Sequence, residues 1–168
     1  MFYSHGDGVW LNPALDVIRK YDPTVYREMT ALDCTWHVYV TEGSYDIDWV
    51  ERVDPFQWFS LMRSLPHAFG VTSMPDPRFP VVDSTERATW LNRPGIEDSA
   101  KEMDVPEVDF LADILVHEFE HSYKLHGERE AFAESTRFGL LLPAYDAPIV
   151  ERSQRTLNEM VEAGEGDI

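Results

Sequence analysis

Cysteine, lysine and long apolar runs are scarce or missing in this chain of 168 residues. Its single cysteine, Cys34, excludes a disulfide framework within the chain and is typical of a reducing compartment. No apolar run approaches the roughly 18 residues that suggest a membrane span. The first residues, MFYSHGDGVW, also lack the basic and apolar regions of a signal peptide. We therefore expect a cytoplasmic protein that does not associate with membranes.

Positive charge is also in short supply. Fourteen Lys and Arg residues face 31 Asp and Glu residues, which gives a formal net charge of −17. The only lysines are Lys20, Lys101 and Lys124. Such a surface repels nucleic acid and anionic lipid, so we expect neither as a partner. Adaptation to salt or a preference for basic partners would both account for this charge.

The length suits a single domain spanning residues 1–168. Residues 12–32 are expected to be helical, with Asn12 as the cap, Pro13 in the first position and a break at Pro23. Strands are expected at 35–41, 68–73 and 86–92, a short helix at 55–65 and a proline-rich loop at 74–80. A final amphipathic helix follows Asp146 as its cap. These elements predict an α+β fold, in which a small mixed sheet of about three strands packs with several helices.

The segment 105–143 contains the clearest motif, His117-Glu118-Phe119-Glu120-His121. Apolar residues at three- and four-residue spacing predict a helix here, with His117 and His121 on its inward stripe. Asp104 and Glu107 are expected to form a capping box with Pro106 in the first turn, and Gly127 to end the helix.

The spacing of this motif suits a zinc site. Residues four apart on a helix share one face, so both imidazoles can reach a single metal ion. Glu118 is rotated away from that face but can reach a water beside the metal, which suits it to act as the catalytic base. We therefore expect one Zn²⁺ per chain.

A third protein ligand is expected from the helix after Gly127, because catalytic zinc sites usually have three. Glu130 is favoured, since Ala133 lies on its face and allows close packing. Glu128 is the alternative. Glu134 is expected to support a ligand histidine by a hydrogen bond from outside the metal site.

These residues resemble the zincin metallopeptidases, and the two His with one Glu resemble the gluzincin branch. The sequence REAFAES is similar to the glutamate helix of that branch, and Leu140–Pro143 is similar to a segment of ImmA/IrrE-type peptidases. The resemblance implies a minimal zincin-like domain that hydrolyses peptide or protein substrates. It also implies a donor to the oxyanion, for which the nearby candidates are Tyr123, His126 and Tyr145. The strand at 86–92 would be either the edge strand that pairs with substrate backbone or another strand of the sheet without that role.

Two other classes of function fit parts of the sequence. The chain could bind zinc as a regulatory or interaction protein without peptidase activity. It could instead use its acidic surface to mimic nucleic acid and inhibit a DNA-binding partner. The sequence leaves substrate identity and oligomeric state open.

Overall fold

The fold is described from a computed structural model, for residues 2–5, 8–31, 35–42, 68–73, 86–124 and 127–164. The helix expected at 55–65 and the loop expected at 74–80 lie outside these ranges. So do Cys34 and His126.

The described strands form one mixed sheet in the order β1-β2-β4-β3. Its strands are β1 (Phe2–His5), β2 (Thr35–Thr41), β3 (Gly70–Ser73) and β4 (Glu86–Asn92). The β1–β2 and β2–β4 pairs are parallel, whereas β3 runs antiparallel to β4. Together with the helices, this sheet confirms the α+β class.

The sheet differs from the expectation in two respects. Strand β1 adds a fourth strand, and its four residues are too few to show a clear period in the sequence. The edge strand next to the motif helix is β3, because β4 lies inside the sheet between β2 and β3. Of the two roles expected for residues 86–92, the edge strand is therefore excluded, and their bounds as a strand were right.

The predicted N-terminal helical segment is two helices, α1 (Gly8–Tyr21) and α2 (Pro23–Thr30). They separate at the expected proline, where the side chain of Asp22 caps α2 by accepting from the Val25 amide at 3.1 Å. The start predicted at Asn12 was wrong, since α1 begins at Gly8 and contains Pro13. Pro13 is the sixth residue of α1, beyond the first four amides that have no partner within a helix, so it removes the one backbone hydrogen bond that its own amide would have made.

Helices α4 (Arg93–Met103) and α5 (Glu107–Ser122) meet at a tight turn. Asp104 ends α4 in the left-handed conformation, with φ of 55°, and Pro106 precedes α5 without a side-chain capping bond. The predicted capping box was therefore wrong. Aspartate is among the residues that tolerate the left-handed conformation. Because Asp104 ends α4 in this conformation, it does not cap α5.

Two further helices complete the described chain, α6 (Glu128–Gly139) and α7 (Ala147–Glu162). Gly127 immediately precedes α6, so it starts that helix rather than ending α5. The predicted cap of the last helix is confirmed, because Asp146 accepts a hydrogen bond from the Ile149 amide at 3.1 Å.

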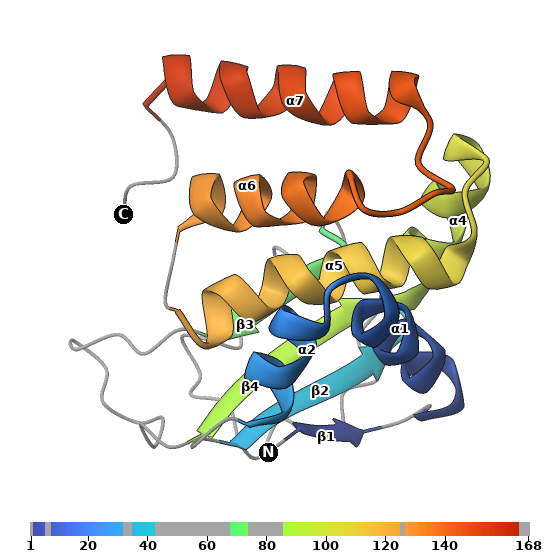
Figure 1. The fold of residues 1–168 in the computed structure, drawn as a ribbon. Helices are drawn as coiled ribbons and strands as arrows, with labels where there is room; N and C mark the ends of the chain where they lie inside the picture. Colours follow the sequence, from blue (N-terminus) through green and yellow to red (C-terminus); the bar gives the residue numbers. More distant parts are fainter. Residues whose placement is uncertain are drawn as a thin grey trace.

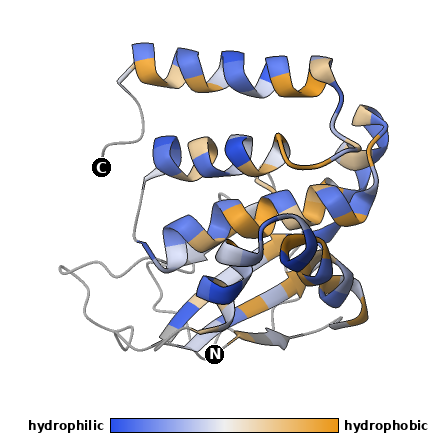
Figure 2. Cartoon of the chain, viewed as in Figure 1, coloured by the Kyte–Doolittle hydropathy of each residue, from blue (hydrophilic) through white to orange (hydrophobic). Residues whose placement is uncertain are grey.

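The helices gather on one side of the sheet, with α6 farther from it than α5 and α7 farther than α6 (Figure 1). Hydrophobic residues follow α5 and the inner strands, whereas α7 is mostly hydrophilic (Figure 2). The core includes Trp36, Val38 and Leu91 from the sheet and Leu111, Leu115 and Phe119 from α5. Its packing holds α5 between the sheet and α6. Of the helices described, none has the length and apolar character to cross a membrane.

Candidate metal centre and catalytic site

The motif occupies the last part of α5, and its two imidazoles converge with one carboxylate. His117 Nε2 lies 3.2 Å from His121 Nε2. Glu128, the first residue of α6, brings Oε1 to 2.9 Å from His121 Nε2 and Oε2 to 3.4 Å from His117 Nε2. A tetrahedral zinc ion with bonds of about 2.0–2.1 Å holds its ligand atoms about 3.3 Å apart. The three donor groups are therefore spaced as such an ion requires.

The protonation of the cluster also suits a cation. Hydrogen bonds from His117 and His121 hold the pKa of Glu128 well below its usual range. Its carboxylate is therefore ionised at neutral pH, as a metal ligand must be. The side chains of His117 and His121 are 15% and 9% exposed, whereas that of Glu128 is 62% exposed. The site thus has a mostly buried nitrogen side and an accessible carboxylate side.

The third member of this cluster differs from the residue that the sequence favoured. Glu130 accepts a hydrogen bond from Arg129 at 3.0 Å and is not among the grouped ligand atoms. Two residues correspond to about 200° of rotation around a helix, so Glu128 and Glu130 cannot face α5 together. The face of α6 that lines the site carries Glu128, Phe132 and Ser135. The geometry therefore supports the alternative, Glu128.

Glu134, predicted to support a histidine, lies elsewhere. Its carboxylate pairs with Arg137 at 3.0 Å, and Arg137 in turn pairs with Asp22 at 2.6 Å. This network joins α6 to the turn before α2, and its role is structural.

Asp113 is the acidic group that the structure brings next to His117. It lies one turn earlier on α5 and is 9% exposed. Its two carboxylate oxygens accept hydrogen bonds from Ser135 Oγ at 2.5 Å and from the Tyr145 hydroxyl at 2.9 Å. Burial raises the pKa of Asp113 to about 6, although these bonds and the neighbouring charge of His117 oppose the rise. Asp113 was not among the site residues predicted from the sequence.

Glu118 lies against the edge strand and is 4% exposed. Thr72 Oγ1 on β3 donates to Glu118 Oε2 at 2.5 Å. A Cβ atom added to Gly70 would lie 2.7 Å from Glu118 Oε1, so the glycine makes room for this carboxylate. Two residues of β3 that the sequence analysis did not single out therefore position the predicted base.

Glu120, the other acid of the motif, serves a different purpose. It is 1% exposed and pairs with Lys124 at 2.7 Å. Burial alone would lower the pKa of Lys124, but the hydrogen bond and charge of Glu120, together with the charges of Glu28 and Glu134, raise it. This ion pair joins a buried carboxylate to a half-buried lysine at the end of α5.

The three candidates for an oxyanion donor differ in their contacts and in whether the structure describes them. The Tyr145 hydroxyl donates to Asp113, and burial beside that carboxyl raises the pKa of Tyr145. Tyr123 is 41% exposed and stacks on Phe119. His126 lies outside the described residues. Neither tyrosine is among the described residues that line the cavity beside the histidines.

That cavity has a volume of about 310 Å³. Its described lining comes from α5 (Phe110, Asp113, Ile114, His117 and Glu118), from α6 (Glu128, Phe132 and Ser135), from Ala68, Phe69 and Gly70, and from Ser153. The predicted base and two of the three clustered ligands therefore face one space. Its sheet side is formed by β3 and the residues before it, and no residue of β4 is in its described lining.

No protein-family model, curated protein or solved structure matches this chain. The likeness to zincin metallopeptidases is therefore a likeness of the motif residues, and membership of a family is not shown.

Proposed function

We propose that the protein is a zinc-dependent metallopeptidase, with zinc held by His117, His121 and Glu128. One observation carries the proposal: the ligand atoms of these three residues lie within 4.8 Å of one another, on two helices that also line a cavity with Glu118. Two imidazoles and a carboxylate are a donor set found in catalytic zinc sites, which leave a fourth position open. One ion per chain is expected.

Zinc bound there would polarise a carbonyl group and lower the pKa of a water ligand to about 7. Glu118 would accept a proton from the attacking water and later deliver it to the leaving amine. The hydrogen bond from Thr72 favours one orientation of that carboxylate. Gly70 leaves the space that this orientation needs.

The edge position of β3 supports a peptide as the substrate. β3 pairs with β4 on one side, and no other described strand pairs with it. An extended peptide can add to such an edge through backbone hydrogen bonds. The residues at the start of this strand also line the cavity, so a peptide bound there would run past Glu118.

A cleavage assay tests the proposal. Purified protein with added zinc is incubated with casein and with a mixed peptide library, beside samples containing chelator and beside Glu118→Gln. We expect chelator-sensitive cleavage, and a loss of roughly 10²–10⁴-fold in Glu118→Gln, the scale of a general base. Cleavage that chelator does not affect would contradict the proposal. Bound zinc with no cleavage would favour the regulatory or interaction alternative.

A further inference from the structure

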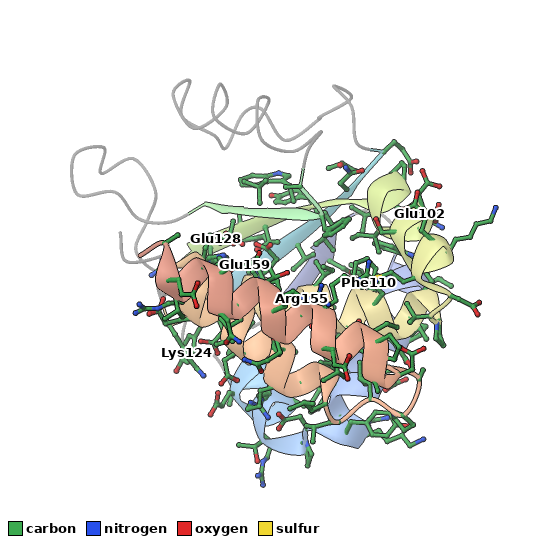
Figure 3. The ribbon with its side chains drawn as sticks, turned by 90° about the horizontal axis from the view of Figure 1, so that it is seen from above. Glu102, Phe110, Lys124, Glu128, Arg155 and Glu159 are labelled. Atoms are coloured by element: carbon green, nitrogen blue, oxygen red, sulfur yellow. The ribbon has the colours of Figure 1, made fainter. Side chains whose placement is uncertain are left out.

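The lining of the cavity beside the histidines extends along α5 from Phe110 to Glu118. Helices α5 and α6 run antiparallel here. Glu128 contacts His121, whereas Ser135, seven residues after Glu128, contacts Asp113, eight residues before His121. The cavity therefore has a cluster end, with His117 and Glu128, and a far end, with Phe110, Asp113 and Ser135. Glu128 and Phe110, both labelled in Figure 3, lie toward these opposite ends.

The far end combines apolar walls with one carboxylate. Phe110, Ile114 and Phe132 provide the apolar lining, and Asp113 is the acid among them. Each oxygen of Asp113 accepts one O–H donor. An ionised carboxylate has about four acceptor positions, so it can accept further hydrogen bonds.

Positive charge is missing from the described lining of this cavity. It contains no Lys or Arg, whereas Asp113, Glu118 and Glu128 are acidic. The chain as a whole carries a formal net charge of −17, which also raises the local concentration of cationic ligands. An acidic group would therefore be unfavourable at the far end.

We propose that the far end of the cavity binds the side chain of a basic residue, Lys or Arg, in a peptide ligand, with its charged group on Asp113. The proposal rests on the proposed function for one point, that the peptide backbone lies at the histidine cluster. Asp113 precedes His117 by four residues, about 6 Å along the helix axis. A long apolar stem with a cationic end matches both that reach and the aromatic and aliphatic walls.

Calorimetric titration with short alanine-based peptides tests this specificity. The peptides differ at one central position, which is Lys, Arg, norleucine or Glu. Norleucine has the stem of lysine without the ammonium group. The protein is the full chain carrying Glu118→Gln, with zinc added and at about pH 8 so that Asp113 is ionised. We expect Lys and Arg peptides to bind at least about tenfold more tightly than the norleucine peptide, and the Glu peptide most weakly.

Two further variants locate the preference. Asp113→Asn should bring Lys and norleucine peptides within about twofold of each other. Asp109→Asn is the matched control, because it removes the same charge from the same helix and Asp109 is absent from the described cavity lining; it should retain the preference. Ser135→Lys leaves Asp113 in the chain and sets a tethered cation beside it. Ser135→Lys should also lose the preference for Lys over norleucine peptides. It provides the test if Asp113→Asn does not fold.

Equal binding of Lys and norleucine peptides, or a preference that survives both Asp113→Asn and Ser135→Lys, would overturn the proposal. Binding is measured in a variant without the base, so the result does not depend on hydrolysis. A Lys preference without cleavage by the unmodified chain would refute the peptidase and leave this inference standing. Cleavage without the preference would do the reverse.

Discussion

Thr72 Oγ1 donates a hydrogen bond to Glu118 Oε2 at 2.5 Å and so joins the edge strand to the motif helix. This bond is the last in a series of hydrogen bonds that runs from β2 through β4 to β3 and then to Glu118. The indole N–H of Trp36, which can only donate, bonds Thr89 Oγ1 at 2.8 Å, and Thr89 Oγ1 lies 2.8 Å from Thr72 Oγ1. Since Thr72 gives its proton to the carboxylate, the proton between the two threonines comes from Thr89. The series therefore directs its donors toward the Glu118 carboxylate.

Thr72→Val should lower kcat because it removes the donor that orients Glu118. We expect a loss of about tenfold, part of the 10²–10⁴-fold that a general base contributes. Thr72→Ser keeps the hydroxyl and should recover most of the activity. Thr41→Val is a control on β2, which β4 separates from β3, since it removes another buried threonine hydroxyl, one that bonds the Leu91 carbonyl. Steady-state kinetics with equal losses in Thr72→Val and Thr41→Val would rule out a specific role for Thr72.

Gly70→Ala should separate catalysis from stability. Its new Cβ would lie 2.7–2.9 Å from Oε1, Cδ and Cγ of Glu118, so the glutamate side chain must move. That movement needs only rotation of a flexible side chain, so the melting temperature should change little. Hydrolysis should fall by at least about tenfold, while zinc stays bound. Gly139→Ala, whose Cβ would approach Tyr145 at 3.1 Å, is the matched control and should retain activity. Full activity in Gly70→Ala would show that Glu118 need not occupy this position.

Asp113 should make stability fall as pH rises. Burial raises its pKa in the folded protein to about 6, above the ordinary value of 3.8. The folded state therefore holds this proton more tightly than the unfolded state does. The stabilisation is complete below about pH 4 and is lost as the pH rises through about 6, with a size on the order of 3 kcal/mol.

Urea unfolding with chelator present checks this dependence, because chelator removes any contribution from bound metal. Asp113→Asn does not titrate, so its free energy of unfolding should lack this loss. We expect the unmodified protein to lose free energy of unfolding relative to Asp113→Asn as the pH rises from about 4 to about 7. Parallel pH profiles for the two proteins would contradict the assignment.

The sequence predicted those elements whose pattern is local. Strands β2 and β4 have the expected bounds, and β2 in particular is rich in β-branched and aromatic residues. The pairing of His117 with His121 follows from helix geometry alone. β1 and the start of α1 were not predicted, because their positions depend on parallel pairing with β2 and on packing against α5.

The rest of the site depends on tertiary packing. Ser135 and Tyr145 reach Asp113 from 22 and 32 residues away, and Thr72 reaches Glu118 from 46 residues away. No local period reveals such contacts. Glu130 was favoured over Glu128 because of Ala133 and the segment Leu140–Pro143. The face of α6 that turns toward the site is instead marked by the spacing of Glu128, Phe132 and Ser135. That spacing, at four and seven residues, was present in the sequence and indicates the packed face.

The zinc affinity of Glu128→Ala, measured beside Glu130→Ala, tests the metal centre most directly. The two variants remove the same group from the first turn of the same helix, so effects on overall charge and helix stability are matched. Zinc content after dialysis and competition with a chelator give the stoichiometry and the affinity. We expect one ion per chain in the unmodified protein and in Glu130→Ala, and a loss of affinity beyond about 100-fold in Glu128→Ala, since a direct ligand should matter more than its supporting residues. Retention of zinc by Glu128→Ala with its loss from Glu130→Ala would contradict the site formed by His117, His121 and Glu128.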